Sequence, residues 1–355
     1  MWSYVRVFRF SQRLRPRFAL SLAALTAAAA CGVQPSDLQT NVRAASRREA
    51  ASQAISAVPA AREERIDDLL AAVAAGREGD GLPARIEALV RRDDDAVRAV
   101  LAFIRGDKAT KMIIDALAGS GTPAAQDALC ALARDIRLPA HVRAEAVSSL
   151  SLIKRPTAPT MTEIGELIRV HDSDLVAPAL FLAGSVARAG RADHPAHAAA
   201  IERIVIAEAA RAHTTDETLD ALAALGNLGS SAVLPRLRIA VDAGDARIRA
   251  AATRALRLVP DAEADRLLAT IVRRDHDATV RAAAIFAAGF RKLDPLVDAL
   301  ADTAQSDPVE YVRAGAVTLL ARNRQLSPRV GRALAYVASS DPKPDLRRLA
   351  AGNAP

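Results

Sequence analysis

The sequence predicts an all-α protein, a right-handed α-solenoid of about seven to eight helix pairs with no β-sheet. The first observation is a repeat: Ile248-Arg249-Ala250, Val280-Arg281-Ala282 and Val312-Arg313-Ala314 recur every 32 residues. A fixed period of a few tens of residues is typical of stacked supersecondary units. The second is composition: 51% of the residues are hydrophobic but only 3% are aromatic, so Ala, Leu, Val and Ile must form the core. The third is helical spacing of apolar residues within each repeat.

One repeat unit shows how its first helix is specified. Asp245 stands where an N-cap residue belongs, because its carboxylate can accept the unpaired amides of the first turn. Pro260 follows the apolar pattern and closes the helix, which we place at 246–259. The apolar stripe of this helix consists of Ile248, Ala252, Ala255, Leu256 and Val259.

The pattern continues in both directions along the chain. A second helix is expected at 262–274, and Asp277 then begins the next unit, four residues before Arg281. In the third copy, Asp307 lies six residues before Arg313, so the turn there is longer. An earlier copy begins at Val142-Arg143-Ala144.

Two segments, 117–129 and 225–237, align with each other and read as helix–turn–helix hairpins. Gly121 and Gly229 are placed to supply the positive φ that ends the first helix of each hairpin. Gly226 belongs to the same glycine-containing turn motif in the second hairpin.

These units resemble the HEAT class of helical repeats, related to armadillo repeats. In that class an Asp and an Arg near the start of the second helix bridge neighbouring units. The resemblance implies a structural ladder that includes the pairs Asp245/Arg249 and Asp277/Arg281, with Arg143 and Arg313 at the equivalent positions. We interpret these residues as scaffold, and not as a catalytic pair.

A narrower resemblance comes from the order of the motifs. The stretch Ile114-Asp115-Ala116-Leu117-Ala118-Gly119-Ser120-Gly121 precedes Gly226-Asn227-Leu228-Gly229 and then Ile248-Arg249-Ala250. This succession resembles the α-helical domain of the vitellogenin, apolipoprotein B and microsomal triglyceride transfer protein family, over roughly residues 85–325. In that family the helical domain is a two-layered horseshoe that cradles lipid-lining β-sheets. This chain has no strand-rich segment, so the horseshoe itself, as a curved binding surface, is what the resemblance implies.

The first thirty residues read as an export signal. Five arginines and no acid lead into an apolar run from Phe18 to Ala30. The segment Ala28-Ala29-Ala30-Cys31-Gly32 resembles a bacterial lipoprotein cleavage site, with Ala28 in place of the usual Leu. Cys31 would then carry the lipid and anchor the chain in the membrane. The alternative is ordinary signal-peptidase cleavage after Ala30, which would leave Cys31 incidental.

These features divide the chain into a signal peptide at 1–30, a tether at 31–60 and the solenoid at 61–355. Gly32, in place of Asp, fits sorting to the outer membrane, facing the periplasm or the cell surface. Cys130 lies in an apolar helix pattern and is expected to be a small core residue.

The charge of the chain argues against nucleic-acid binding. Removing residues 1–30 lowers the formal net charge from +7 to +2 and takes away five of the eleven aromatic residues. Binding to nucleic acid normally needs basic patches interleaved with aromatics, and the mature chain would have neither.

No catalytic constellation, cofactor motif or metal site is recognised, so we do not expect an enzyme. His194 and His197 have a ligand-like spacing, but Pro195 favours a loop. The acidic run 93–95 is expected to cap a helix that starts at Ala96. Phe286 and Phe290 are four residues apart, and we favour core packing between units over a hydrophobic ligand groove.

The function predicted from these observations is a non-catalytic scaffold, exported to the bacterial envelope, that binds a partner protein of unknown identity on its concave surface. The alternative is lipid or lipoprotein binding and transport, which rests on the vitellogenin resemblance. A third possibility, a subunit resembling the HEAT-like bilin lyases, is disfavoured because the chain has few aromatics for a pigment pocket.

Overall fold

A computed structural model describes residues 64–77, 81–108, 111–170 and 175–352. The chain divides into two units, 1–68 and 69–355, and the account below concerns the second. Helices alone make up the regular structure of the described residues, which contain no β-strand. The predicted all-α class is therefore confirmed.

Eighteen α-helices, α3 to α20, follow one another along the described chain. Their bounds are α3 Ile66–Ala74, α4 Leu82–Arg92, α5 Asp94–Phe103, α6 Lys111–Ser120, α7 Pro123–Arg134, α8 Ala140–Ser149, α9 Ala158–Arg169, α10 Val176–Gly190, α11 Pro195–Ala210, α12 Thr215–Leu228, α13 Leu234–Ala240, α14 Ala246–Ala255, α15 Ala262–Arg274, α16 Ala278–Ala288, α17 Val297–Ser306, α18 Glu310–Arg322, α19 Pro328–Ser340 and α20 Pro344–Ala351. Short 3₁₀ turns (η2 to η5) join some of them, and a π-helical turn, η1, follows α5.

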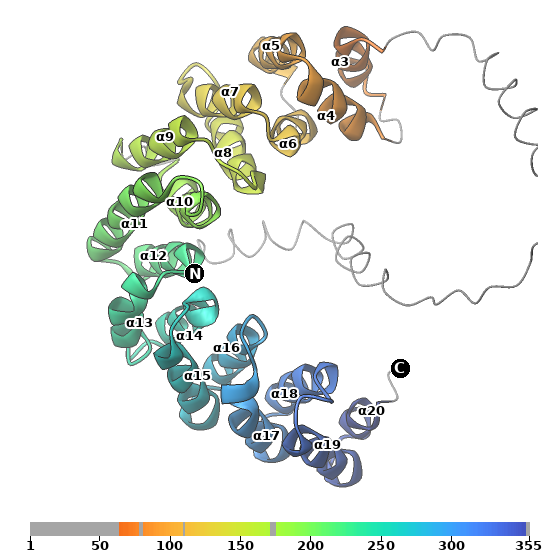
Figure 1. The fold of residues 1–355 in the computed structure, drawn as a ribbon, viewed down its shortest axis with the longest axis vertical. Helices are drawn as coiled ribbons and strands as arrows, with labels where there is room; N and C mark the ends of the chain where they lie inside the picture. Colours follow the sequence, from red (N-terminus) through yellow and green to blue (C-terminus); the bar gives the residue numbers. More distant parts are fainter. Residues whose placement is uncertain (1–63, 78–80, 109–110, 171–174, 353–355) are drawn as a thin grey trace, which may run out of the picture. The chain divides into compact units, whose positions relative to one another are not determined.

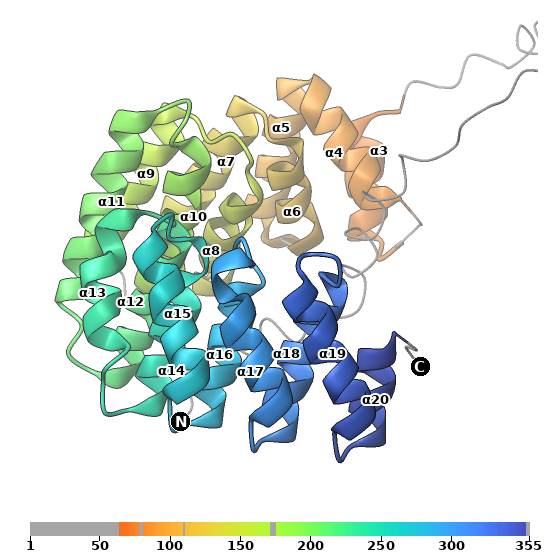
Figure 2. The same cartoon turned by 60° about the horizontal axis from the view of Figure 1, so that its bottom comes forward.

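The helices form two layers. From α4 onward, each even-numbered helix packs against the next even-numbered one, and this inner layer continues to α20. The odd-numbered helices form the outer layer, in which α5 packs on α7, α7 on α9 and α9 on α11, and α15 packs on α17 and α17 on α19. Within residues 69–352 the inner helices lie on the inside of the bend (Figure 1), and Figure 2 shows the helix pairs standing side by side. This is the arrangement of an α-solenoid.

From α7 to α20 the described helices make seven successive outer–inner pairs whose members are in contact, in line with the seven or eight expected. The second helix of the best-defined unit, α15, has the predicted bounds. The first, α14, ends at Ala255, and a 3₁₀ turn at Leu256–Leu258 replaces the last predicted turn. Helix α5 begins at Asp94, two residues before the expected start, because Asp93 is the N-cap and accepts a 2.8 Å hydrogen bond from the Asp95 amide.

The core contains aliphatic side chains and no aromatic ring within the described residues. The largest fully buried side chains are Ile86, Ile104, Ile113, Ile114, Leu117, Leu129, Leu132, Leu150, Met161, Ile164, Ile168 and Leu182. Cys130 is buried in α7, as expected, and burial raises the pKa of its thiol to about 12. The thiolate, which is the reactive form, is therefore scarce at neutral pH.

Candidate functional site

The repeated arginines form a buried ladder along the starts of the inner helices α14, α16 and α18. Arg281 donates two hydrogen bonds to Asp307, of 2.7 and 2.9 Å, and a third, of 2.9 Å, to the carbonyl oxygen of Asp275. Arg249 and Arg313 repeat this pattern with Asp275 and Asp341, through Nε distances of 2.9 and 2.8 Å. Each aspartate therefore joins the arginine of the preceding unit to that of its own unit.

The acidic partners differ from those implied by the HEAT resemblance. Asp245 accepts a 2.8 Å hydrogen bond from the Arg247 amide, and Asp277 accepts one of 2.7 Å from the Thr279 amide. Both carboxylates therefore cap their own helices, α14 and α16. Asp275 lies in the turn before Asp277, within reach of the preceding unit, and this position decides which carboxylate meets Arg249.

Two of the ladder carboxylates, Asp275 and Asp341, are stabilised in their charged form. Burial raises the pKa of Asp341, but hydrogen bonds from Arg313 and from the Lys343 amide outweigh burial and hold that pKa below its ordinary value. The pKa of Asp275 is lowered in the same way, by hydrogen bonds from Arg249 and from the Asp277 amide that outweigh burial. The guanidinium groups share the effect, because the hydrogen bonds that they donate to Asp307 and Asp341 raise the pKa of Arg281 and Arg313. The ladder is a structural ion-pair network.

Arg143, the fourth arginine of the predicted ladder, lies in α8 and is also buried. It occupies the same place in its inner helix as the other three. Residues 171–174, which follow the next outer helix, lie outside the described part of the chain.

Two of the three predicted turn glycines have the expected backbone. Gly121 and Gly229 have φ values of 67° and 53° and follow the ends of α6 and α12. Gly226 differs, because it lies inside α12. A Cβ atom added to Gly226 would lie 2.7 Å from the Cα atom of Ala255 in α14. Gly226 is therefore a close-contact residue between two inner helices.

The segment 226–229 joins three consecutive inner helices. Asn227 is buried, and its side-chain amide donates a 3.1 Å hydrogen bond to the carbonyl oxygen of Phe181 in α10. Its Oδ1 accepts a hydrogen bond from Arg257, which follows α14. The motif that carried the family resemblance is thus a helix junction, and sequence alone did not indicate that role.

A second set of arginines, which the sequence analysis missed, caps the carboxyl ends of the inner helices. Arg188 and Arg191 donate to the carbonyl oxygens of Asn227 and Leu228, at 3.1 and 2.9 Å. Arg91 reaches the Gly119 carbonyl at 3.0 Å, and Arg324 reaches that of Ala350 at 2.6 Å. Cations at this end of a helix also interact favourably with its dipole. Their irregular spacing leaves no period by which the sequence could reveal them.

Most aromatic side chains of the described residues are exposed to solvent. Of the six aromatic residues in the described ranges, all but Phe103 are about half exposed: Phe181, Phe286, Phe290, Tyr311 and Tyr336. Phe286 and Phe290 are 50% and 55% exposed, and their ring centroids are 5.1 Å apart. The expected core packing of this pair between units is therefore wrong. The small Ala, Val and Leu side chains already fill the space between α16 and its neighbours.

Most of these aromatics belong to the inner layer. Phe181 lies on α10, Phe286 on α16 and Tyr311 on α18, and Phe290 follows directly after α16. Exposed apolar side chains that gather on one side of a soluble protein mark interaction surfaces more often than isolated ones do. The solvent side of the inner helices is therefore the candidate functional site.

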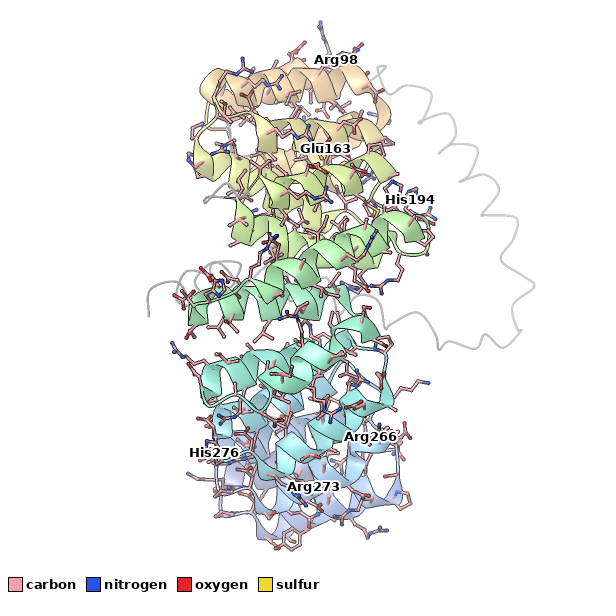
Figure 3. All side chains as sticks on the ribbon, turned by 90° about the vertical axis from the view of Figure 1, so that its left-hand side faces the viewer. Arg98, Glu163, His194, Arg266, Arg273 and His276 are labelled. Atoms are coloured by element: carbon pink, nitrogen blue, oxygen red, sulfur yellow. The ribbon has the colours of Figure 1, made fainter. Side chains whose placement is uncertain are left out.

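The outer layer presents separate charged residues. Figure 3 faces this layer, with Arg98, Glu163, Arg266 and Arg273 labelled at different heights along the stack. Arg273 in α15 is paired with Asp302 in α17 at 3.1 Å, so this charge ties neighbouring outer helices together.

His194 and His197 lie at the start of α11, with ring centroids 6.0 Å apart. In the described ranges, no three His, Cys, Asp or Glu side chains are grouped so as to hold a metal ion. Cys31, the export signal and the tether lie outside the described residues. Of the helices that are described, none combines the length and the apolar character needed to cross a bilayer.

Comparison with known proteins gives a family and a fold. Residues 36–321 match the family model described as the vitellogenin TPR domain. Among solved structures, the chain is similar to lipovitellin, from a study of its lipid–protein interactions, with a TM-score of 0.54 and 17% sequence identity over 82% of this chain and 34% of that one. The chain thus spans about a third of the lipovitellin chain.

Two other solved structures are more distant. Human deoxyhypusine hydroxylase gives a TM-score of 0.31 at 17% identity, covering 79% of this chain and 99% of that one. The CpcE–CpcF complex of a phycocyanin lyase from Nostoc gives 0.32 at 17% identity, covering 80% and 98%. No curated protein matches the sequence.

Proposed function

The chain belongs to the vitellogenin TPR domain family, and from that premise we propose that it is a non-catalytic scaffold that binds a partner protein on the solvent side of its inner helices. The observation that carries the proposal is the display of Phe181, Phe286, Phe290 and Tyr311 on inner-layer elements. Aromatic residues are enriched at the energetic centres of protein interfaces. An α-solenoid offers such a surface without any reactive residue.

The buried ladder supports this proposal because it fixes the positions of neighbouring inner helices. Arg249, Arg281 and Arg313 each hold two successive units together through buried hydrogen bonds. A surface spread over several helices keeps its shape only if the helices keep their register. A rigid surface also loses less entropy when a partner binds.

Site-specific photo-crosslinking tests the proposal. A photoreactive phenylalanine analogue at Phe181 is expected to capture one defined partner protein from cells, because this side chain is on the inner layer. The same analogue at Tyr336, an equally exposed residue on the outer helix α19, is the matched control. Equal capture from both positions, or no adduct from the inner one, would contradict partner binding at this surface.

Lipid binding is a second candidate, and two observations favour it. The half-exposed Phe286–Phe290 pair offers apolar surface on an inner helix, and the similar lipovitellin chain comes from a structure concerned with lipid–protein interactions. Mass spectrometry of the purified protein distinguishes the candidates. Lipid co-purifying in stoichiometric amount would favour lipid binding, and its loss in a Phe286→Ala variant would place the lipid on this surface.

We also propose that the protein is exported and held at the bacterial envelope by a lipid on Cys31. The support is the basic, then apolar, sequence that precedes Cys31 and the following Gly32. Cells fed a fatty-acid analogue are expected to label the wild-type chain, and a Cys31→Ala variant should lose the label and leave the membrane fraction. Export with no label on either chain would instead support ordinary cleavage after Ala30.

A further inference from the structure

The strongest feature outside the ladder is a patch on the solvent side of α14, α16 and α18. Its centre is the exposed pair Phe286 and Phe290, whose rings are 5.1 Å apart. Neither ring is buried by a neighbouring unit, so the fold does not account for them. Two phenylalanines held half in water cost free energy that a covering partner would recover.

The 32-residue register identifies what lies beside each ring. Arg249, Arg281 and Arg313 occupy equal places in α14, α16 and α18, and their shared hydrogen bonds show that the three helices stack in this register. In this register Phe286 corresponds to Arg254 of α14, and Phe290, two residues past the end of α16, corresponds to Arg322 at the end of α18. From this register we infer one cation on the α14 side of the aromatic pair and one on the α18 side.

Two leucines extend the apolar centre. Leu258 occupies the place of Phe290 one unit earlier and is partly exposed. Leu319 of α18 lies next to the end of α16, because a Cβ atom on Gly289 would be 3.8 Å from its Cδ1 atom. We call these four apolar residues and the two arginines the α14–α18 patch: Leu258, Phe286, Phe290, Leu319, Arg254 and Arg322.

The patch is basic, and its own helices do not neutralise it. Helices α14 and α16 contain no acidic residue, and the single acid of α18, Glu310, lies at the opposite end of the helix and pairs with Lys343. Within the described chain, no carboxylate is paired with Arg254 or Arg322. The buried ladder arginines and the outer Arg273, by contrast, all have aspartate partners.

The neighbouring inner helix carries the opposite charge. Asp216 and Asp220 lie in the amino-terminal half of α12, away from the patch, and are partly exposed. Burial and the nearby Asp216 raise the pKa of Asp220, as expected for two carboxylates without a cation between them. A nucleic-acid backbone or an anionic membrane that followed the inner layer would meet these acids. A short peptide segment can cover the patch without reaching these acids, so a protein segment fits this surface better.

Resting on the proposed function, we propose that the α14–α18 patch is the docking site for an acidic, apolar peptide segment of the partner protein. Apolar side chains of that segment cover Phe286 and Phe290, and its carboxylates pair with Arg254 and Arg322. Arginine and aromatic residues together are the side chains most often found at the centre of such interfaces. Complementary charge would speed association and set the orientation of the segment.

Fluorescence anisotropy with defined peptides tests this docking site on the full chain. The probe is a short fluorescein-labelled peptide of leucine and glutamate with the leucines on one helical face. The control peptide has lysine in place of every glutamate. We expect the acidic peptide to bind at least about tenfold more tightly than the basic one, a difference that shrinks as salt is added. Equal or stronger binding of the basic peptide would overturn the proposal.

Matched variants locate the binding. Phe286→Ala should weaken binding of the acidic peptide by about tenfold. Tyr336→Ala removes an equally exposed ring from the outer layer and should leave the binding unchanged. Arg254→Glu combined with Arg322→Glu should abolish binding of the acidic peptide, and Arg332→Glu on α19 should have no effect. All five sites are exposed or partly exposed, so far-UV circular dichroism is expected to match wild type. Binding that survives both patch variants would overturn the assignment.

Two further probes separate other occupants. Vesicles containing phosphatidylglycerol are tested by co-sedimentation, and a single-stranded oligonucleotide is tested by anisotropy. If the protein binds either of them in preference to the acidic peptide, that ligand replaces the peptide as the occupant. Failure of this docking site can also be distinguished from failure of the scaffold function tested by crosslinking. If Phe181 captures a partner but the patch variants leave that capture and peptide binding unchanged, the docking site is wrong while the scaffold function remains.

Discussion

Replacing Arg281 by alanine is expected to lower the free energy of unfolding by about 3–5 kcal/mol, the usual cost of removing one partner from a buried ion pair. Arg281 and Asp307 are only 7% and 8% exposed, and the substitution leaves the Asp307 carboxylate buried without its cation. The Asp275 carbonyl also loses its 2.9 Å donor. Urea denaturation followed by circular dichroism would measure the change.

Arg273→Ala is the matched control. Arg273 also pairs with an aspartate of a neighbouring helix, Asp302, but both side chains are partly exposed. Exposed pairs contribute about 0–1 kcal/mol, so the control should lose little stability. The ladder assignment fails if the two variants lose the same amount. Replacing Arg281 with Met and Asp307 with Leu together should recover much of the loss, because no unpaired charge then remains.

Because a repeat protein need not unfold in one step, hydrogen exchange should accompany the denaturation curves. Loss of the Arg281–Asp307 pair is expected to increase exchange first in the amides of α16 and of the turn between α17 and α18, the two elements it joins. Uniformly faster exchange along the whole stack would instead indicate a single cooperative unit.

Gly226→Ala is the second large effect that we expect, with a loss of about 1–3 kcal/mol from overpacking. The new methyl group would lie 2.7 Å from the Cα and 2.9 Å from the Cβ of Ala255, so α12 and α14 must move apart. This loss opposes the gain of up to about 1 kcal/mol that alanine normally brings within a helix. The position of the urea midpoint reports which effect is larger.

Gly331→Ala is expected to stabilise the protein, in contrast to Gly226→Ala. Gly331 lies inside α19, and a Cβ atom there meets no other atom within 4 Å. Only the helix-propensity term applies, so this variant should gain about 0.5–1 kcal/mol. If Gly226→Ala also raised the midpoint, Gly226 would not be a close-contact residue between the two helices.

Some features of the fold follow from local chemistry and were therefore predictable. Asp245 and Asp277 cap helices because a carboxylate beside the first turn meets unpaired amides wherever that turn is placed. Gly121 and Gly229 have positive φ because glycine alone reaches that conformation at little cost. The core of the described residues lacks aromatics, as expected for a chain with few to bury.

Other features depend on which residues meet across the stack. The partner of Arg249 is Asp275 rather than Asp245, because the choice depends on how one turn lies against the next unit. The sequence pattern predicts a turn at Gly226, because its close neighbour Ala255 is known only when α12 and α14 are packed. Phe286 and Phe290 were expected in the core because their spacing is the same whether a helix face is covered or open to water.

The sequence by itself determined the all-α class, the 32-residue unit, the aliphatic core and the resemblance to the family to which the chain belongs. Each of these follows from the spacing and composition of residues within one unit. The tertiary structure decided the ladder partners, the arginines that cap neighbouring helices and the aromatic side of the inner layer. Those depend on contacts between units, since the same amphipathic helix can bury its stripe against several neighbours and only the stack selects one.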